Sequence, residues 1–239
     1  MNLLIFSSKY VVSSIFICLI ASILGFSSMM QFSTIPATNV ALDQKKVIIL
    51  DAGHGGEDCG TIGVNGIYEK DINLRMAFIL QEYFELAGYK VFLTREEDKL
   101  LYREEENIYG QRKIYDLKNR LLFAEKIDNA IFISLHMNSY PIEKYCGLQV
   151  WFQSNSKISY SIATSIQEHV AKTIQPDNTR KIKAADKNIY LLDRLKHPAV
   201  LIECGFLSNA EECGKLSEDN YQKELSFVIF CAILNSIER

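Results

Sequence analysis

The stretch VIILDAGHGGEDCG, residues 47–60, is an apolar strand that runs into a glycine-rich loop carrying one histidine, His54. Glycines after a parallel strand often bind phosphate, but neither a GxGxxG nor a GxxxxGK[ST] pattern occurs here. The nucleotide-binding interpretation is therefore weak. A lone imidazole in such a loop favours a metal site instead.

Strands and helices alternate along the chain that follows this loop. The pattern predicts strands at residues 46–53, 90–94, 130–136, 147–152, 188–192 and 199–206, and helices at residues 70–89, 117–127, 159–174 and 220–237. This alternation is typical of an α/β domain. We expect an open, mostly parallel sheet with helices on both faces.

Residues 1–42 differ in composition from the rest of the chain. No charged residue occurs between Lys9 and Asp43, and residues 11–30 are apolar, small or hydroxyl-bearing over a length that suits a bilayer span. We interpret this segment as a membrane anchor followed by a linker, with a cleaved signal peptide as the alternative. Either would place the domain at residues 43–239 outside the cytoplasm.

Composition narrows the possible functions. The formal net charge is −3, which makes nucleic acid an unsuitable partner. The one basic cluster, DNTRKIKAADK at residues 177–187, is interpreted as a solvated loop, with a polyanion-binding lip as the alternative. The six cysteines form no CxxC pattern, which favours buried free thiols over disulfides or a cysteine nucleophile.

Three chemically capable side chains fall at or just beyond the ends of predicted strands. His54 follows the first strand, His136 closes AIFISLH, and Glu203 lies in AVLIECGF. Ligands of parallel sheets bind beyond the carboxyl ends of the strands, so these residues should converge at one edge. Glu69, which opens the first helix, should lie near the same loops, although a carboxylate there also suits the helix dipole.

Two imidazoles and one carboxylate, from His54, Glu69 and His136, would make a catalytic Zn²⁺ site with one open position. The spacing is not HExxH, so tertiary structure must bring these ligands together. Glu203 lies in an otherwise apolar strand, where a carboxylate faces a desolvation cost. Beside a hydrated zinc ion it could act as general base and then general acid; a buried salt bridge is the alternative.

The sequence evidence for a role at this site is weaker for the other polar residues. Asp51 could orient a ligand imidazole or fix the glycine loop. Asn138 and Ser139 follow His136 and could contact a substrate or cap the next turn. His169 and His197 are interpreted as surface or packing residues.

Four ordered motifs carry a family resemblance: LDAGHGGEDCGTIG, YEKDINL, FISLHMNS and AVLIECGFLSN. In order and spacing they resemble the zinc-dependent N-acetylmuramoyl-L-alanine amidases of the type 3 catalytic family, from Lys46 to about the C-terminus. The resemblance implies one Zn²⁺ held by His54, Glu69 and His136. It also implies that Glu203 is the catalytic glutamate of a zinc amidase domain at residues 43–239.

The resemblance further implies a substrate, peptidoglycan, cut between N-acetylmuramic acid and L-alanine. The segments GQRKIYDLKNR and NTRKIKAADKNIYLL are similar to those of spore cortex amidases, which act in the forespore intermembrane space toward muramic-δ-lactam, some with an accessory sporulation lipoprotein. A vegetative or septal autolysin, a non-catalytic peptidoglycan-binding module and a zinc peptidase are the alternatives.

Overall fold

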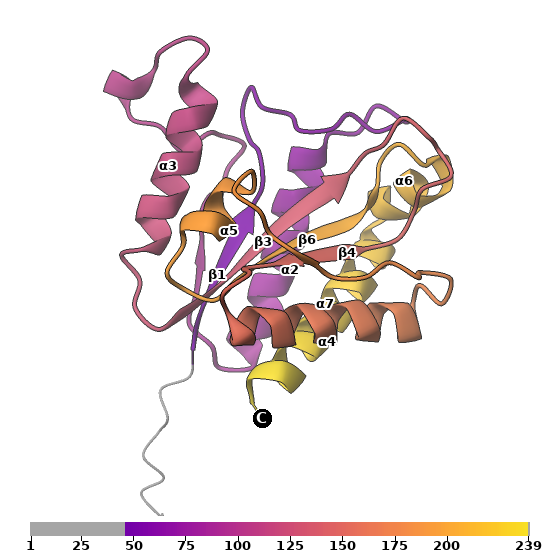
Figure 1. Ribbon diagram of the computed structural model, residues 1–239. Coiled ribbons are helices and arrows are strands. Elements are labelled where there is room, and N and C mark those ends of the chain that lie inside the picture. The colour runs from indigo at the N-terminus through magenta and orange to yellow at the C-terminus, as the bar shows by residue number, and fades with distance from the viewer. Residues whose placement is uncertain (1–45, 239) are drawn as a thin grey trace, which may run out of the picture. The chain divides into compact units, whose positions relative to one another are not determined.

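The computed structural model describes residues 46–238, in which an open sheet has helices on both of its faces (Figure 1). The strands are β1 (Val47–Ala52), β2 (Val91–Leu93), β3 (Ala130–Asn138), β4 (Gln149–Phe152), β5 (Lys183–Ala184) and β6 (Ala199–Phe206). The α-helices of this range are α2 (Glu69–Leu86), α3 (Arg112–Ala124), α4 (Lys157–Thr173), α5 (Tyr190–Arg194), α6 (Ala210–Ser217) and α7 (Asp219–Ile237), together with the short 3₁₀ turn η1 (Glu104–Glu106).

The sheet is mostly parallel, as the sequence predicts. Its strand order is β2-β1-β3-β6-β4-β5. The pairs β1–β2, β1–β3, β3–β6 and β4–β5 are parallel, whereas β4 runs antiparallel to β6. Parallel neighbours need a crossover connection, and α2 and α3 provide the crossovers from β1 to β2 and from β2 to β3. The carboxyl ends of β1, β3 and β6 consequently share one edge.

Alternation along the strands divides the core into two layers. Ile48 and Leu50 lie in the larger apolar cluster with residues of α2, α4, α6 and α7, whereas Ile49 between them lies in a smaller cluster with residues of α3 and α5. Successive strand side chains point to opposite faces, so a buried parallel strand is apolar on both. Each fully buried aliphatic side chain contributes about 1.5–3 kcal/mol.

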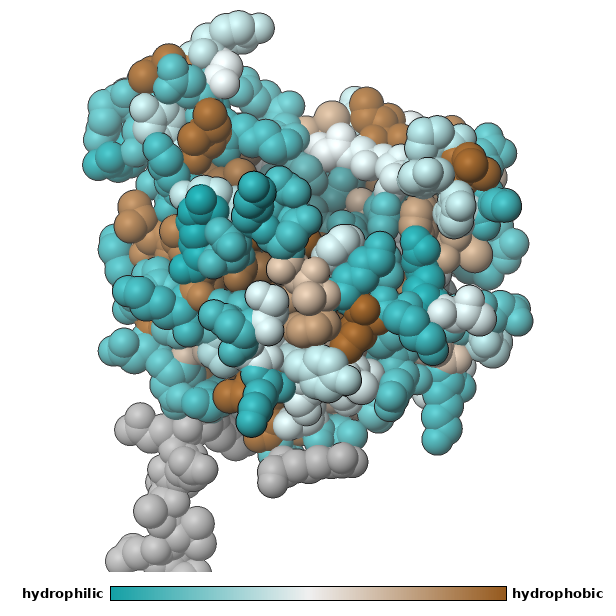
Figure 2. Space-filling view, in the orientation of Figure 1, coloured by the Kyte–Doolittle hydropathy of each residue, from teal (hydrophilic) through white to brown (hydrophobic). Residues whose placement is uncertain are grey.

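The outer surface is mainly polar. Figure 2 shows hydrophilic residues over most of one face of the domain, with hydrophobic residues scattered among them rather than gathered in one broad patch. This distribution is ordinary for a folded domain with its apolar residues buried in the two clusters.

The strand prediction at residues 188–192 is wrong, because this segment enters the short helix α5. An apolar run of five residues does not distinguish a strand from a buried helical turn. Asp186 turns the chain here, since its Oδ1 accepts a hydrogen bond from the Asn188 amide at 2.8 Å. Leu191 and Leu192 are then buried in the smaller cluster. Helix α6 and the two-residue strand β5 are further elements that the sequence pattern did not predict.

The predicted membrane anchor and linker at residues 1–42 lie outside the described residues. Within residues 46–238, the structure contains no helix with the length and apolar character needed to cross a bilayer.

Candidate active site

Strand register places two of the predicted site residues side by side. His136 of β3 and Glu203 of β6 are paired neighbours in the sheet. Phe132 lies four residues before His136, and Ala199 lies four residues before Glu203. Both of these apolar residues belong to the smaller cluster, which packs against α3 and α5. Because side chains repeat every second residue, His136 and Glu203 share that face of the sheet. His54 lies just beyond the end of β1, the other neighbour of β3.

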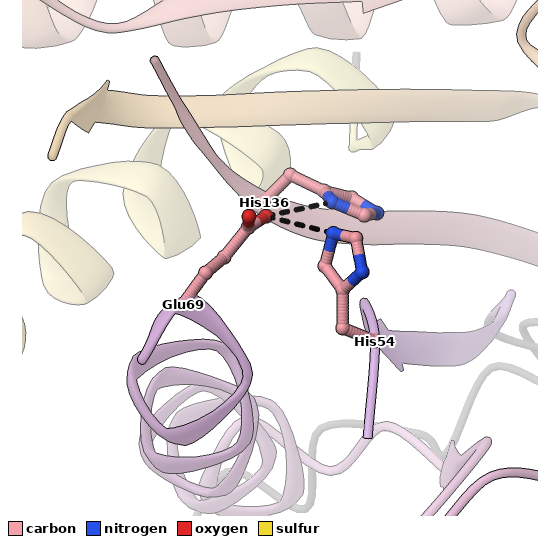
Figure 3. Close-up of side chains that lie close together, drawn as sticks. All are labelled: His54, Glu69 and His136. Atoms are coloured by element: carbon pink, nitrogen blue, oxygen red, sulfur yellow. Dashed lines mark hydrogen bonds and ion pairs between the residues drawn. The ribbon is translucent and has the colours of Figure 1, made fainter. Parts of the chain in front are cut away.

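The structure brings His54, Glu69 and His136 together, as Figure 3 shows. Their candidate ligand atoms all lie within 4.8 Å of one another. Glu69 Oε1 is 3.2 Å from His54 Nε2 and 3.0 Å from His136 Nδ1. The two imidazole rings meet edge to face, with centroids 4.9 Å apart. In residues 46–238, no other group of three or more His, Cys, Asp or Glu side chains is arranged in this way.

Glu69 is held as a carboxylate by its surroundings. It is the first residue of α2, where the helix dipole favours negative charge. Its Oε1 accepts a hydrogen bond from the Met137 amide at 2.9 Å, and its Oε2 accepts one from the Thr61 amide at 2.8 Å. Burial raises the pKa of Glu69, but the hydrogen bonds and charges of His136 and His54 outweigh it and hold that pKa well below its usual range.

Asp58 is a site residue that the sequence interpretation missed. Its Oδ2 accepts a hydrogen bond from His54 Nδ1 at 2.9 Å, which leaves Nε2 facing Glu69, and it also pairs with Lys113 Nζ at 2.9 Å. Burial lowers the pKa of His54, but the hydrogen bonds and charges of Asp58 and Glu69 outweigh this effect and raise that pKa to about 9. The cluster thus favours positive charge. The sequence signal that could have identified Asp58 is its position four residues after His54 in the same loop.

The backbone at His54 has an uncommon conformation, with φ of 63°. Two buried arginines hold this loop by its carbonyl oxygens. Arg95 donates to the oxygens of Ala52 (Nε, 2.9 Å) and Gly53 (Nη2, 3.2 Å). Arg120 donates to those of Ala52 (Nη1, 2.8 Å) and His54 (Nη2, 2.8 Å). Such a left-handed non-glycine residue persists where its surroundings over-determine it, and these four bonds do so.

Within residues 46–238, Asp51 bonds to neither His54 nor His136. Its carboxylate accepts hydrogen bonds from Thr94 Oγ1 at 2.8 Å, Ser134 Oγ at 2.6 Å and Arg120 Nη1 at 2.6 Å. Burial raises the pKa of Asp51, but the Arg120 charge and these bonds bring it below its usual range. Arg120 Nε also donates to Asp116 at 2.9 Å. Asp51 therefore acts on the His54 loop through Arg120.

Replacing this arginine, Arg120→Met, should lower the free energy of unfolding by about 3–5 kcal/mol, because Asp51 and Asp116 are left buried without their cation. Urea denaturation measures the change. The matched control is Arg75→Met, which breaks the exposed pair with Asp219 and should cost less than about 1 kcal/mol. Equal losses in the two variants would contradict the assigned role of Arg120.

Glu203 has an unsatisfied oxygen at the site. Its Oε2 is buried and has no hydrogen-bond partner within residues 46–238. Burial, with a smaller contribution from Glu69, raises the pKa of Glu203 to about 6, although the charges of His136 and His54 oppose the rise. A buried carboxyl group without a partner is costly, and such groups concentrate at functional sites. Its proton can be gained or lost near neutral pH.

Asn138 and Ser139 follow His136 at the rim of the site. Asn138 ends β3 beside Phe206, and a register irregularity separates it from His136. Its Oδ1 accepts a hydrogen bond from the Ser139 amide at 2.8 Å, so it caps the turn that it begins. Ser139 itself is exposed.

Gly60 gives a test of how tightly the cluster is packed. A Cβ at this position would lie 2.5 Å from Glu69 Oε2 and 2.7 Å from His54 Cδ2, so Gly60→Ala should displace both side chains and weaken metal binding at least about tenfold. The control is Gly66→Ala. Both glycines have positive φ, 65° and 85°, so the backbone cost is shared, but nothing lies within 4 Å of a Cβ at residue 66. Metal titration of both variants should separate them; equal metal affinities would contradict the close packing.

Comparisons with known proteins converge on one enzyme family. The Amidase_3 model, described as N-acetylmuramoyl-L-alanine amidase, matches residues 48–235. The germination-specific N-acetylmuramoyl-L-alanine amidase of Bacillus subtilis (strain 168) is 35% identical over 189 residues, which cover 79% of this chain and 78% of that protein.

Solved structures agree with the family match. The CwlD amidase from Clostridioides difficile, solved in complex with the GerS lipoprotein, is 39% identical with a TM-score of 0.77, and the match covers 81% of this chain and 98% of that one. The amidase AmiC2 of Nostoc punctiforme is 25% identical with a TM-score of 0.69, and the match covers 81% and 98% of the two chains.

Proposed function

The chain belongs to the Amidase_3 family of N-acetylmuramoyl-L-alanine amidases, and from this membership we propose that it is a zinc-dependent enzyme of the spore cortex. The reaction of the family is hydrolysis of the amide between N-acetylmuramic acid and the L-alanine of peptidoglycan. The observation that carries the proposal is the close grouping of His54, Glu69 and His136 beside Glu203.

The residues present suit one Zn²⁺. Zinc takes nitrogen and oxygen ligands, and catalytic sites have three protein ligands with the fourth position open, which His54, Glu69 and His136 would provide. Asp58, hydrogen-bonded to His54 Nδ1, would fix the orientation of that imidazole. When bound, the ion supplies Lewis-acid chemistry, acidifying water and polarising the carbonyl to be attacked.

Glu203 would move the proton. Its carboxylate takes a proton from the water that attacks the lactyl carbonyl carbon, and it returns this proton to the departing nitrogen of L-alanine as the C–N bond breaks. The products are a free carboxylate on the muramic acid and a free amine on the peptide. The raised pKa of Glu203, about 6, supports this role, because the group must both accept and donate a proton within one turnover.

The spore assignment is supported by the relatives. One is named as germination-specific, and another was solved with a lipoprotein. We propose that the enzyme removes peptides from muramic acid in the forespore intermembrane space, as a step toward muramic-δ-lactam, with residues 1–42 as its membrane anchor and linker. An accessory sporulation lipoprotein is the proposed partner.

Two measurements test the proposal. The purified chain, supplied with zinc and intact muropeptides, should release peptides whose masses correspond to cleavage before L-alanine. Spores from a strain lacking the gene should assemble but contain no muramic lactam and fail to complete germination. Normal lactam content with unseparated growing cells would favour a vegetative or septal autolysin, whereas peptidoglycan binding without cleavage would favour the binding module.

A further inference from the structure

Arg180 lies in the basic segment at residues 177–187 and has no role in the mechanism above. Its guanidinium carbon is 4.5 Å from the centroid of the Phe206 ring. Its Nε is buried without a hydrogen-bond partner, and within residues 46–238 the guanidinium makes no ion pair. Arginine has five N–H donors, and burial of one without an acceptor carries a free-energy cost. The side chain is therefore held in place while its Nε donor has no acceptor within residues 46–238.

The backbone around Arg180 is firmly attached to strand β4. The Arg180 amide donates to Asn178 Oδ1 at 3.0 Å, and Asn178 Nδ2 donates to the carbonyl oxygen of Leu148 at 2.9 Å. On the other side, Gln149 Nε2 donates to the carbonyl oxygen of Lys181 at 2.7 Å. These bonds fix the base of the side chain, so little backbone ordering would be needed on ligand binding.

Arg180 also lies close to the reacting end of the sheet. Glu203 pairs with His136 of β3, and Phe206, on which Arg180 stacks, pairs with Asn138. The bulge between these pairs leaves Glu203 and Phe206 about 7 Å apart along the strand. Stacking on Phe206 therefore places the guanidinium near the end of the sheet that carries Glu203.

We propose that Arg180 binds the free α-carboxylate of the second residue of the stem peptide and so selects substrates that carry it. The glycan chain of N-acetyl sugars is uncharged, so the anionic groups of the substrate lie on its peptide. The planar guanidinium matches a carboxylate through two parallel hydrogen bonds. Two extended residues span about 7 Å, which is comparable with the separation along β6. The proposal rests on the amidase reaction described above.

The test uses the full chain and two disaccharide tripeptides that differ only at the second stem residue, D-glutamate with a free α-carboxylate or the same residue amidated. Arg180→Met should lower kcat/KM for the carboxylate substrate by about 10- to 100-fold and for the amidated one by less than about threefold. Arg180→Lys should recover part of the loss. The control Lys181→Met removes the adjacent exposed charge and should change neither value.

Two outcomes overturn the proposal. In the first, Arg180→Met lowers kcat/KM equally for both substrates, which would make Arg180 a structural partner of Phe206. In the second, kcat/KM falls for neither substrate.

A binding measurement tests the role of Arg180 independently of the amidase assignment. The dipeptide L-alanyl-D-glutamine, which has a free α-carboxylate and an uncharged γ-amide, is titrated calorimetrically into metal-free protein. It should bind the parent chain at least about tenfold more tightly than Arg180→Met. If the parent cleaved neither substrate, the amidase assignment would fail, and equal dipeptide binding by parent and variant would separately reject the role of Arg180.

Discussion

The Glu203→Gln chain should lose about 10²- to 10⁴-fold in kcat, the range that a positioned general acid–base group contributes. The amide keeps the size of the carboxyl group, but it cannot take up the proton of the attacking water. Its Oε1 or Nε2 would occupy the place of the buried, unpartnered Oε2 of Glu203, so packing should change little. Turnover of muropeptides, followed by product masses, measures the loss.

Metal content separates this loss from damage to the site. Glu203 is not among the three grouped candidate ligands, so Glu203→Gln should hold as much zinc as the parent. Glu211→Gln is the matched control, because Glu211 is an exposed residue of α6 that forms an ion pair with Lys215. Near-parental turnover in Glu203→Gln would remove this residue from the mechanism, and lost zinc would make it a ligand.

His136→Ala should weaken zinc binding by more than about 100-fold, since even partners that only orient a ligand contribute 10- to 100-fold. The variant removes one of the three proposed ligands and leaves Glu69 with one imidazole neighbour instead of two. Titration with a competing metal indicator gives the affinity, and elemental analysis gives the stoichiometry. Activity should fall in parallel.

His169→Ala is the control for this variant. His169 lies on α4, where its Nδ1 bonds within the helix to the Ser165 carbonyl oxygen at 2.8 Å, and it is not part of the cluster. Its loss should leave zinc affinity unchanged. Should His136→Ala retain stoichiometric zinc as tightly as His169→Ala, the ligand assignment would be rejected.

Much of the fold follows from local sequence signals. Apolar runs that end in glycine or polar residues predicted the strands around Leu50, Ile133 and Ile202, because strands buried on both faces need continuous apolar sequence. Parallel strands align their carboxyl ends, which is why His54, His136 and Glu203 could be placed at one edge from the sequence alone.

The residues that support the site were harder to predict. Arg120 contacts the His54 carbonyl across 66 positions, and Arg95 contacts Gly53 across 42. The local sequence around a charged residue in an amphipathic helix or a polar loop does not indicate a distant partner. A solvent-exposed arginine would fit the same sequence pattern. The sequence leaves Asp51 two roles, orienting an imidazole or fixing the glycine loop. Only the packing of α3 against the sheet shows that its cation is Arg120.

The hydrogen bonds that Arg95 and Arg120 donate to carbonyl oxygens of the His54 loop should keep the site folded when zinc is removed. In zinc fingers the metal supplies the folding free energy, so chelators denature them. Here hydrogen bonds from Arg95 and Arg120 hold the loop that carries His54, and His136, a proposed ligand, extends from a sheet strand with an apolar core on both faces. A chelator should therefore switch the enzyme off without unfolding it, and fresh zinc should restore activity without a refolding step.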